Sequence, residues 1–245
     1  MIDKLYQPRL RVFAGPNGSG KSTMKSVLKP ELLGAYINPD EIEATIKKTN
    51  FLYLDTYGVS CTFSELITFY EQSTLLKKAE LADLIHDLNL YENQIDFHNV
   101  GINSYWASVT ADFVRSLLLK QHQSFTFETV MSSPDKIQLL QKAQELGYKT
   151  YLYYVATEDP SINIRRVQQR VANGGHDVPH DKIIARYHRS LDLLLSAIKA
   201  TNRAYLFDNS AENQVCIAEI TNGSALLMRA DSKPAWFQKY ILDKL

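Results

Sequence analysis

The segment RVFAGPNGSGKSTMK, residues 11–25, sets four glycine or proline residues directly before a Lys-Ser-Thr triplet. The apolar residues of 10–14 predict a buried strand, and the apolar residues of 24–28 recur at helical spacing. The glycines therefore mark a strand-to-helix turn, and this turn matches the phosphate-binding pattern G-x-x-x-x-G-K-[ST]. A flexible turn that binds nothing is the alternative, and the strand and helix on either side argue against it.

In such a loop, glycine lets the chain curl so that its N–H groups point inward, and the next helix adds partial positive charge. Lys21 can then reach the outer phosphates of a nucleoside triphosphate, and the Ser22 hydroxyl can ligate Mg²⁺. We therefore expect ATP and Mg²⁺ as cofactors. The residues expected to contact the nucleotide here are Gly15, Pro16, Asn17, Gly18, Ser19, Gly20, Lys21, Ser22 and Thr23.

Composition limits the remaining choices. The chain has 245 residues, of which 45% are hydrophobic, and its 27 basic and 27 acidic residues cancel. A packed core is expected, and the charge balance argues against a dedicated nucleic-acid binder. Cys61 and Cys216 show no metal-ligand spacing and predict buried thiols in a reducing compartment. No apolar run approaches the length of a membrane span, so we expect a cytoplasmic protein.

The order of the predicted elements favours an α/β fold, namely a P-loop NTPase three-layer α/β/α sandwich with a mostly parallel sheet. Residues 49–103 carry an amphipathic helical pattern and predict a helical insertion within a single kinase domain spanning 1–245. Residues 214–245 predict a hairpin around Asn222-Gly223 followed by a helix. The expected strands are Leu10–Ala14, Ala35–Ile37, Ser124–Glu128, Thr150–Ala156 and Ala204–Asp208.

Asp40 and Glu41 come just after the second expected strand, in YINPDEI, residues 36–42. Ligands of open α/β sheets bind beyond the carboxyl ends of the strands. A carboxylate there can accept the proton of an attacking hydroxyl, so Asp40 is a candidate general base and Glu41 a candidate substrate contact. Alternatively, Asn38-Pro39-Asp40 is a turn in which Asp40 only caps a helix.

Glu128 and Thr129 end the third expected strand, in FTFETVMSS, residues 125–133. An acid at that point can hold Mg²⁺ or bind the acceptor, so we expect Glu128 as a metal ligand and both residues at the substrate. Asp208, at the end of YLFD, is the competing acid, although its strand should lie farther from the reacting phosphate.

Five arginines flank the loop NGGHDVP, residues 173–179: Arg165, Arg166, Arg170, Arg186 and Arg189. A Gly-Gly loop can move as a lid, and guanidinium groups on a lid can neutralise a transferring phosphoryl group. We expect Arg170 and Arg186 as catalytic residues and Arg166 as a nucleotide contact, while His176 has a structural or nucleotide-contacting role. A solvated basic helix face is the alternative.

Together, GPNGSGKST, INPDEI, FETVMSS and the stretch from GYKTYLYYV to AYLFDNS resemble the zeta-toxin-like P-loop kinases over residues 9–48 and 104–210. The resemblance implies that Asp40 is the base toward a sugar hydroxyl of a nucleotide sugar, typically UDP-N-acetylglucosamine. It also implies that Glu128 and Thr129 contact the acceptor. The ATP-clamping arginine pair of the family corresponds to Arg166 or Arg170 and to Arg186 or Arg189.

The resemblance further suggests an antitoxin protein as a partner, whereas the 49–103 insertion departs from the family. The sequence thus predicts an ATP- and Mg²⁺-dependent small-molecule kinase. One alternative is a polynucleotide or nucleoside kinase, which would need a basic groove that the neutral composition does not indicate. The other is a nucleotide-dependent switch that binds a partner without transferring phosphate.

Overall fold

The fold is taken from a computed structural model, in which residues 7–175 and 177–245 are described. His176 of the arginine-flanked loop lies outside the described residues. The chain divides into a P-loop unit, formed by the residues up to Leu33 and by Thr126–Leu245, and a second unit, Gly34–Phe125. Whether the whole chain acts as the single domain expected from the sequence stays a prediction. None of the helices in the described ranges has the length and apolar character needed to cross a membrane.

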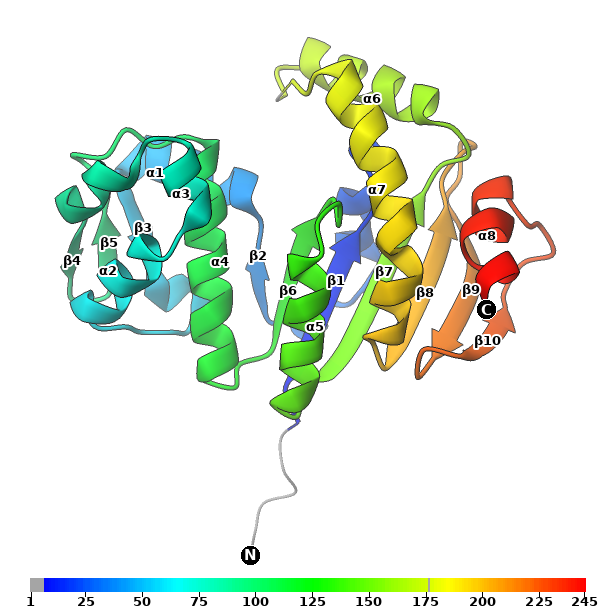
Figure 1. The fold of residues 1–245 in the computed structure, drawn as a ribbon, viewed down its shortest axis with the longest axis horizontal. Coiled ribbons are helices and arrows are strands. Elements are labelled where there is room, and N and C mark those ends of the chain that lie inside the picture. Colours follow the sequence, from blue (N-terminus) through cyan, green and yellow to red (C-terminus); the bar gives the residue numbers. More distant parts are fainter. Residues whose placement is uncertain (1–6, 176) are drawn as a thin grey trace, which may run out of the picture. The chain divides into compact units, whose positions relative to one another are not determined.

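The principal sheet has seven strands in the order β10-β9-β8-β7-β1-β6-β2 (Figure 1). β1 pairs in parallel with β7, and β7 with β8, whereas β9 is antiparallel to both β8 and β10. The expected α/β fold with a mostly parallel sheet is therefore confirmed. The strands are β1 Arg9–Ala14, β2 Ala35–Ile37, β6 Phe125–Thr129, β7 Lys149–Ala156, β8 Arg203–Asp208, β9 Val215–Thr221 and β10 Ala225–Met228.

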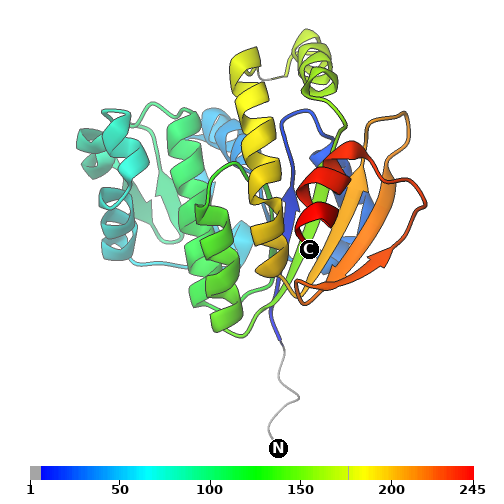
Figure 2. The same ribbon diagram turned by 45° about the vertical axis from the view of Figure 1, so that its right-hand side comes forward.

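Three helices of the P-loop unit, α5, α7 and α8, lie on the same side of the sheet in both views (Figures 1 and 2). The buried Tyr154 hydroxyl of β7 lies 2.8 Å from Ser190 Oγ of α7, and the Ser190 hydroxyl donates to the Val130 carbonyl at 2.7 Å. This chain of bonds satisfies polar groups that would otherwise be costly to bury. The helices are α5 Asp135–Glu145, α6 Pro160–Ala172, α7 His180–Lys199 and α8 Ala235–Tyr240, with the 3₁₀ helices η1 Lys21–Val27, η2 Pro30–Leu32 and η5 Leu242–Lys244.

At the C-terminal end, Asn222 and Gly223 connect β9 to β10 with φ angles of 50° and 72°. With Ser224 they form a three-residue connection, in which the Ser224 N–H donates to the Thr221 carbonyl at 3.3 Å. The positive φ angles of this tight turn explain the Asn-Gly pair. The chain then continues into α8, whose Trp236 indole N–H donates to Asp208 Oδ1 at 2.9 Å. The end of the chain is thus fixed to the carboxyl end of β8.

The second unit combines helices with a three-stranded antiparallel sheet of order β3-β5-β4. The helical pattern of residues 49–103 did not predict this sheet, because each strand is three residues long and too short to show an alternating period. Its elements are α1 Pro39–Thr49, β3 Phe51–Tyr53, η3 Leu54–Tyr57, α2 Phe63–Glu71, α3 Thr74–Lys78, η4 Ala82–Asp87, β4 Asn89–Tyr91, β5 Gln94–Asp96 and α4 Ser104–Lys120.

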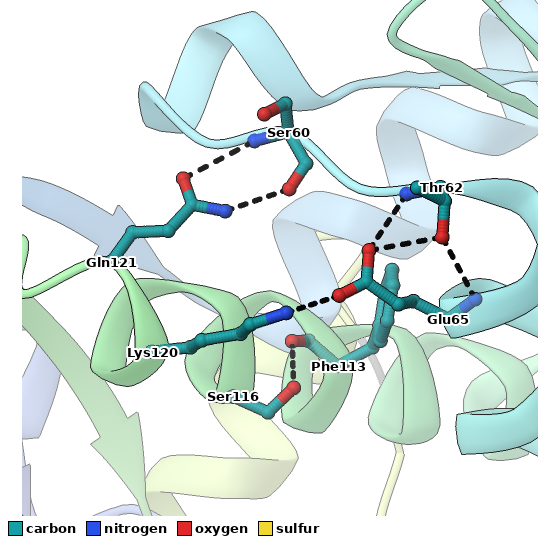
Figure 3. Close-up of polar contacts among 7 residues, drawn as sticks. All are labelled: Ser60, Thr62, Glu65, Phe113, Ser116, Lys120 and Gln121. Atoms are coloured by element: carbon teal, nitrogen blue, oxygen red, sulfur yellow. Dashed lines mark hydrogen bonds and ion pairs between the residues drawn. The ribbon is translucent and has the colours of Figure 1, made fainter.

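A capping box begins α2 and ties it to the end of α4 (Figure 3). The Glu65 N–H donates to Thr62 Oγ1 at 3.2 Å, and the Thr62 N–H donates to Glu65 Oε2 at 2.8 Å. The other carboxylate oxygen of Glu65 pairs with Lys120. Next to this pair, Gln121 Nε2 donates to the Ser60 carbonyl at 2.7 Å. The entry into α2 is therefore held by hydrogen bonds to two residues of the α4 end.

The capping box predicts a pH dependence of stability. The bond from Lys120, followed by the bonds from Thr62, lowers the pKa of the Glu65 carboxyl to about 2 from its ordinary 4.5. Because the folded-state pKa is the lower one, this contribution is complete above pH 4.5 and is lost as the pH falls toward 2. Glu65→Gln should therefore show a smaller drop in melting temperature between pH 6 and pH 3 than the wild type. Glu80→Gln, at an exposed site, is the control, and an unchanged acid slope in Glu65→Gln would contradict the prediction.

Candidate nucleotide-binding site

The loop between β1 and η1 can be built only with glycine at its key positions. Gly15 and Gly18 have φ angles of 141° and 73°, where other residues are strained. A Cβ atom on Gly15 would lie 2.0 Å from the Val155 carbonyl oxygen, and one on Gly18 would lie 2.5 Å from the Asn163 carbonyl oxygen. The loop is thus curled and closely packed against the end of β7 and the start of α6.

The three residues that follow the glycines lie where the motif predicts them, at the start of a helix. η1 begins at Lys21, and its first turns have 3₁₀ geometry. Lys21 Nζ donates to the Pro16 carbonyl at 2.9 Å, so the lysine side chain folds back over the loop. Thr23 Oγ1 lies 2.7 Å from the Gly20 carbonyl, to which it donates, and 3.0 Å from Gln214 Oε1.

Ser22 and Glu128 are brought together from different parts of the sequence. β6, which carries Glu128, is the neighbour of β1 in the sheet, and Ser22 Oγ lies 3.4 Å from Glu128 Oε2. A hydroxyl and a carboxylate oxygen suit Mg²⁺, which is commonly bound by one or two protein groups and the phosphates of its substrate. Among the described residues, no group of three or more His, Cys, Asp or Glu could hold a metal by itself. The pair therefore fits Mg²⁺ bound together with a triphosphate.

The competing acid, Asp208, has structural partners. Its Oδ1 accepts from the Trp236 indole at 2.9 Å and from the Ser210 hydroxyl at 2.7 Å. β8 is also separated from β1 by β7, so Asp208 lies farther from the loop than Glu128, as the sequence predicted.

Thr129 lies at the end of β6 next to Glu128, and its Oγ1 accepts from the Met131 N–H at 3.0 Å. The assignment of Thr129 to the acceptor stays a prediction.

The arginines divide into two groups. Arg186 of α7 is half-buried, and its Nη1 lies 3.5 Å from Asn17 Oδ1 of the loop. Arg166 of α6 is half-buried; its Nη2 donates to the Ala211 carbonyl at 3.4 Å, and its buried Nη1 has no hydrogen-bond partner among the described residues. The exposed arginines are Arg165, Arg170 and Arg189. The expected roles of Arg170 and Arg186 remain untested, but the geometry favours Arg186 over Arg170.

Three residues outside the predicted site also contact the glycine motif. Asn163 Nδ2 donates to the Asn17 carbonyl at 2.6 Å, and Asn209 Nδ2 donates to the Ser19 carbonyl at 2.8 Å. Gln214 contacts Thr23, as described above. Asn209 directly follows β8, and its place at the carboxyl end of a strand is a signal that the sequence contained. Asn163 and Gln214 carried no such signal.

Asp40 and Glu41 belong to the second unit, in the first turn of α1. The helix is capped by Asn38, whose Oδ1 accepts from the Asp40 N–H at 2.9 Å. The alternative in which Asp40 serves only as the cap is therefore wrong. Both carboxylates are exposed. The pKa of the Tyr57 hydroxyl is raised to about 12, chiefly by the burial of Tyr57 and further by the negative charge of Glu41.

A model of the zeta toxin family matches residues 68–215. The chain belongs to the zeta toxin family. This family, one of ATP-dependent kinases, is the one that the sequence motifs resembled, so the resemblance is confirmed. The match begins after the P-loop and includes residues 68–103, which we expected to depart from the family. The P-loop assignment itself therefore depends on the motif and on the geometry of the loop.

The chain is also similar to one curated protein and to several solved structures. An uncharacterized protein of Haemophilus influenzae is 35% identical over 69 residues, which are 28% of this chain and 49% of that protein. Among solved structures, AvrRxo1-ORF1 in complex with AvrRxo1-ORF2 and sulphate ions has a TM-score of 0.55 at 17% identity, and its complex with ATP has a TM-score of 0.52. The sulphate complex is matched over 96% of this chain and 63% of that chain, the ATP complex over 91% and 61%.

The PezAT toxin–antitoxin system of Streptococcus pneumoniae gives a TM-score of 0.52 at 15% identity, over 96% of this chain and 78% of that chain. At these identities the structures support the fold alone. This chain spans less than two thirds of the AvrRxo1-ORF1 chain and about half of the curated relative.

The contact between Gly18 and Asn163 predicts the effect of adding a methyl group to the loop. Gly18→Ala combines a left-handed φ with a clash 2.5 Å from a backbone oxygen, so the loop must shift and ATP binding should fall at least tenfold. Gly147→Ala is the matched control, because Gly147 also has a positive φ (81°) but has no described atom within 4 Å of the position that a Cβ atom would take. Calorimetric ATP titration and melting temperatures would measure both effects. ATP binding by Gly18→Ala at wild-type strength would contradict the close packing of the loop.

Proposed function

We propose that this zeta toxin family member is an ATP- and Mg²⁺-dependent kinase that transfers the γ-phosphate to a hydroxyl of a nucleotide sugar, such as UDP-N-acetylglucosamine. The observation that carries the proposal is the approach of Ser22 Oγ to Glu128 Oε2, 3.4 Å apart, at the mouth of a glycine loop that ends in Lys21. A binding module for phosphate alone would not require a carboxylate beside the motif serine. A phosphotransferase would use such a carboxylate to hold the metal ion that neutralises phosphate charge.

Each group of the P-loop unit has a defined task in this reaction. The loop N–H groups and Lys21 bind the β- and γ-phosphates, and Ser22 and Glu128 hold the metal. When bound, Mg²⁺ would neutralise negative charge on the phosphates. Arg186 lies next to Asn17, from where its guanidinium can stabilise charge on the transferring group.

The acceptor side of the proposal depends on Asp40 as the general base and on Glu41, Glu128 and Thr129 as acceptor contacts. The nucleotide sugar and the role of Asp40 as the base both follow from the family resemblance. A second protein of the antitoxin type is part of the same proposal, because the PezAT relative is named as a toxin–antitoxin system and AvrRxo1-ORF1 is crystallised with AvrRxo1-ORF2.

The proposal is tested by incubating the protein with Mg²⁺-ATP and a panel of nucleotide sugars, nucleosides and oligonucleotides. Mass spectrometry would detect the gain of one phosphate. The expected result is phosphorylation of a nucleotide sugar by the wild type and none by Lys21→Ala, which lacks the lysine charge at the phosphates. If only nucleosides or oligonucleotides gained a phosphate, the protein would be a nucleoside or polynucleotide kinase. If it bound ATP but transferred no phosphate, it would be a nucleotide-dependent switch.

Arg186 and Arg189 lie on one helix but differ in position, so they make a matched pair. Arg186→Ala should reduce turnover on the order of 10³-fold, as for arginines that stabilise a phosphoryl-transfer transition state. Arg189→Ala, at an exposed site, should retain turnover within about twofold. Steady-state rates at saturating ATP would measure both. If both variants turn over normally, the role passes to Arg166 or Arg170.

Asp40→Asn tests the general base. Removing such a base typically costs about 10² to 10⁴ in rate, while ATP binding in the P-loop does not use the carboxylate. Because Asn38 is the cap, Asp40→Asn should also leave the melting temperature unchanged. The control is Asn38→Ala, which should lower stability by about 1 kcal/mol while retaining transfer within a few-fold. Full transfer activity in Asp40→Asn would remove the base assignment.

A further inference from the structure

We propose that Asn163 and Asn209 are positioning residues for the triphosphate: each holds one peptide group of the P-loop so that its N–H faces the ligand. The inference rests on the proposed function, because it concerns the same site. Neither residue belongs to the glycine motif, and they reach the loop from α6 and from the end of β8. What they share is the geometry of the bond each makes.

Each asparagine binds a carbonyl that directly precedes a glycine with positive φ. Asn163 Nδ2 donates to the Asn17 carbonyl at 2.6 Å, before Gly18 (φ 73°). Asn209 Nδ2 donates to the Ser19 carbonyl at 2.8 Å, before Gly20 (φ 98°). Peptide groups next to glycine rotate most easily, because glycine has no Cβ atom and can adopt the widest range of φ and ψ angles. The two bonds therefore fix the two peptide groups of the loop that would otherwise turn most freely.

Holding a carbonyl also aims the N–H of the same peptide group. Because the peptide is planar and trans, its C=O and N–H point in opposite directions. A carbonyl drawn toward Asn163 leaves the Gly18 N–H directed away from α6, and the bond from Asn209 does the same for the Gly20 N–H. In the part of the chain that is described, neither N–H donates a hydrogen bond. Both are therefore available to phosphate oxygens, which are bound by successive backbone N–H groups in such loops.

The packing around each asparagine supports this role. Asn163 is fully buried, and its Oδ1 accepts from the Thr157 hydroxyl, so the orientation of its amide is fixed at both ends. A Cβ atom on Gly20 would lie 2.3 Å from Asn209 Nδ2, so this amide also touches the loop directly. The Asn163 amide is therefore held at both ends, and the Asn209 amide packs directly against a glycine of the loop.

The chain offers a matched control at the other end of β8. Asn202 immediately precedes that strand, is half-buried like Asn209, and bridges two backbone segments: its Oδ1 accepts from the Thr150 N–H at 2.8 Å. It stabilises the strand pair but has no contact with the P-loop. Asn202→Ala therefore reports what the loss of a bridging asparagine does to the fold alone.

The experiment compares the wild type with Asn209→Ala, Asn163→Ala and Asn202→Ala. Binding of Mg²⁺-ATP and of inorganic tripolyphosphate, which has no base or ribose, is measured by calorimetry, together with the melting temperature. Loss of one directing hydrogen bond should raise both dissociation constants about tenfold in Asn209→Ala and Asn163→Ala. All three variants should melt a few degrees below the wild type, because each loses a bridging side chain. Asn202→Ala, however, should bind both ligands within about twofold of the wild type.

The contrary results are distinguishable from one another. Asn209→Ala that melts lower but binds both ligands normally would reduce the asparagine to a structural role and overturn the inference. Weaker binding of ATP with unchanged binding of tripolyphosphate would mean that Asn209 contacts the base or ribose, which also overturns it. Failure of the wild type to bind either ligand would remove the proposed function itself. If Asn163→Ala does not fold, Asn209→Ala decides the question by itself, because its side chain is only half-buried.

Discussion

The curl of the chain between β1 and η1 is the constraint on which the rest of the site depends. Its tightest point is Gly15, whose Cα leaves no room for a side chain beside the Val155 carbonyl of β7. All six residues of β1 pair with β7, and Val155 directly follows the last of their partners, Tyr154, so the loop turns against the end of this strand pair. The strand pair beside the loop therefore restricts the conformations that the loop can adopt.

Because the loop ends at a fixed place, the residues after it are placed as well. η1 begins one residue beyond Gly20, and this brings Ser22 to within 3.4 Å of Glu128 on β6. β6 is the neighbour of β1 in the sheet, whereas the strand of Asp208 is one position farther away on the other side. Strand order thus decides which acidic residue meets the motif serine, and Asp208 instead holds the indole of Trp236.

The sequence could predict those features of the site that depend on a few consecutive residues. The strands, the glycine loop and the acid at the end of β6 are each encoded within a few consecutive residues. The bonds from Asn163 and Asn209 to the loop were not predictable, because they join residues 146 and 190 positions apart in the chain. The same holds for the arginines: Arg166 and Arg170 are one turn apart on α6, and only the packing of the helix shows which is half-buried. The three-residue strands of the second unit are too short for a periodic signal.

Arg166 and Arg186 are half-buried positive charges, and in the proposed kinase they would favour binding of an anion. In the described ranges neither guanidinium forms an ion pair; one meets the carbonyl of Ala211 and the other the side-chain amide of Asn17. Neutral oxygens satisfy a hydrogen bond but leave the positive charge in place, and a half-buried charge without a counter-ion is destabilising. A bound triphosphate would relieve that cost for both residues at once. Had either arginine been paired with a carboxylate, as Arg203 and Arg229 are with Glu219, a phosphate would first have to displace that partner. The neutral contacts therefore keep both guanidinium charges available to a ligand, at the expense of stability in the free protein.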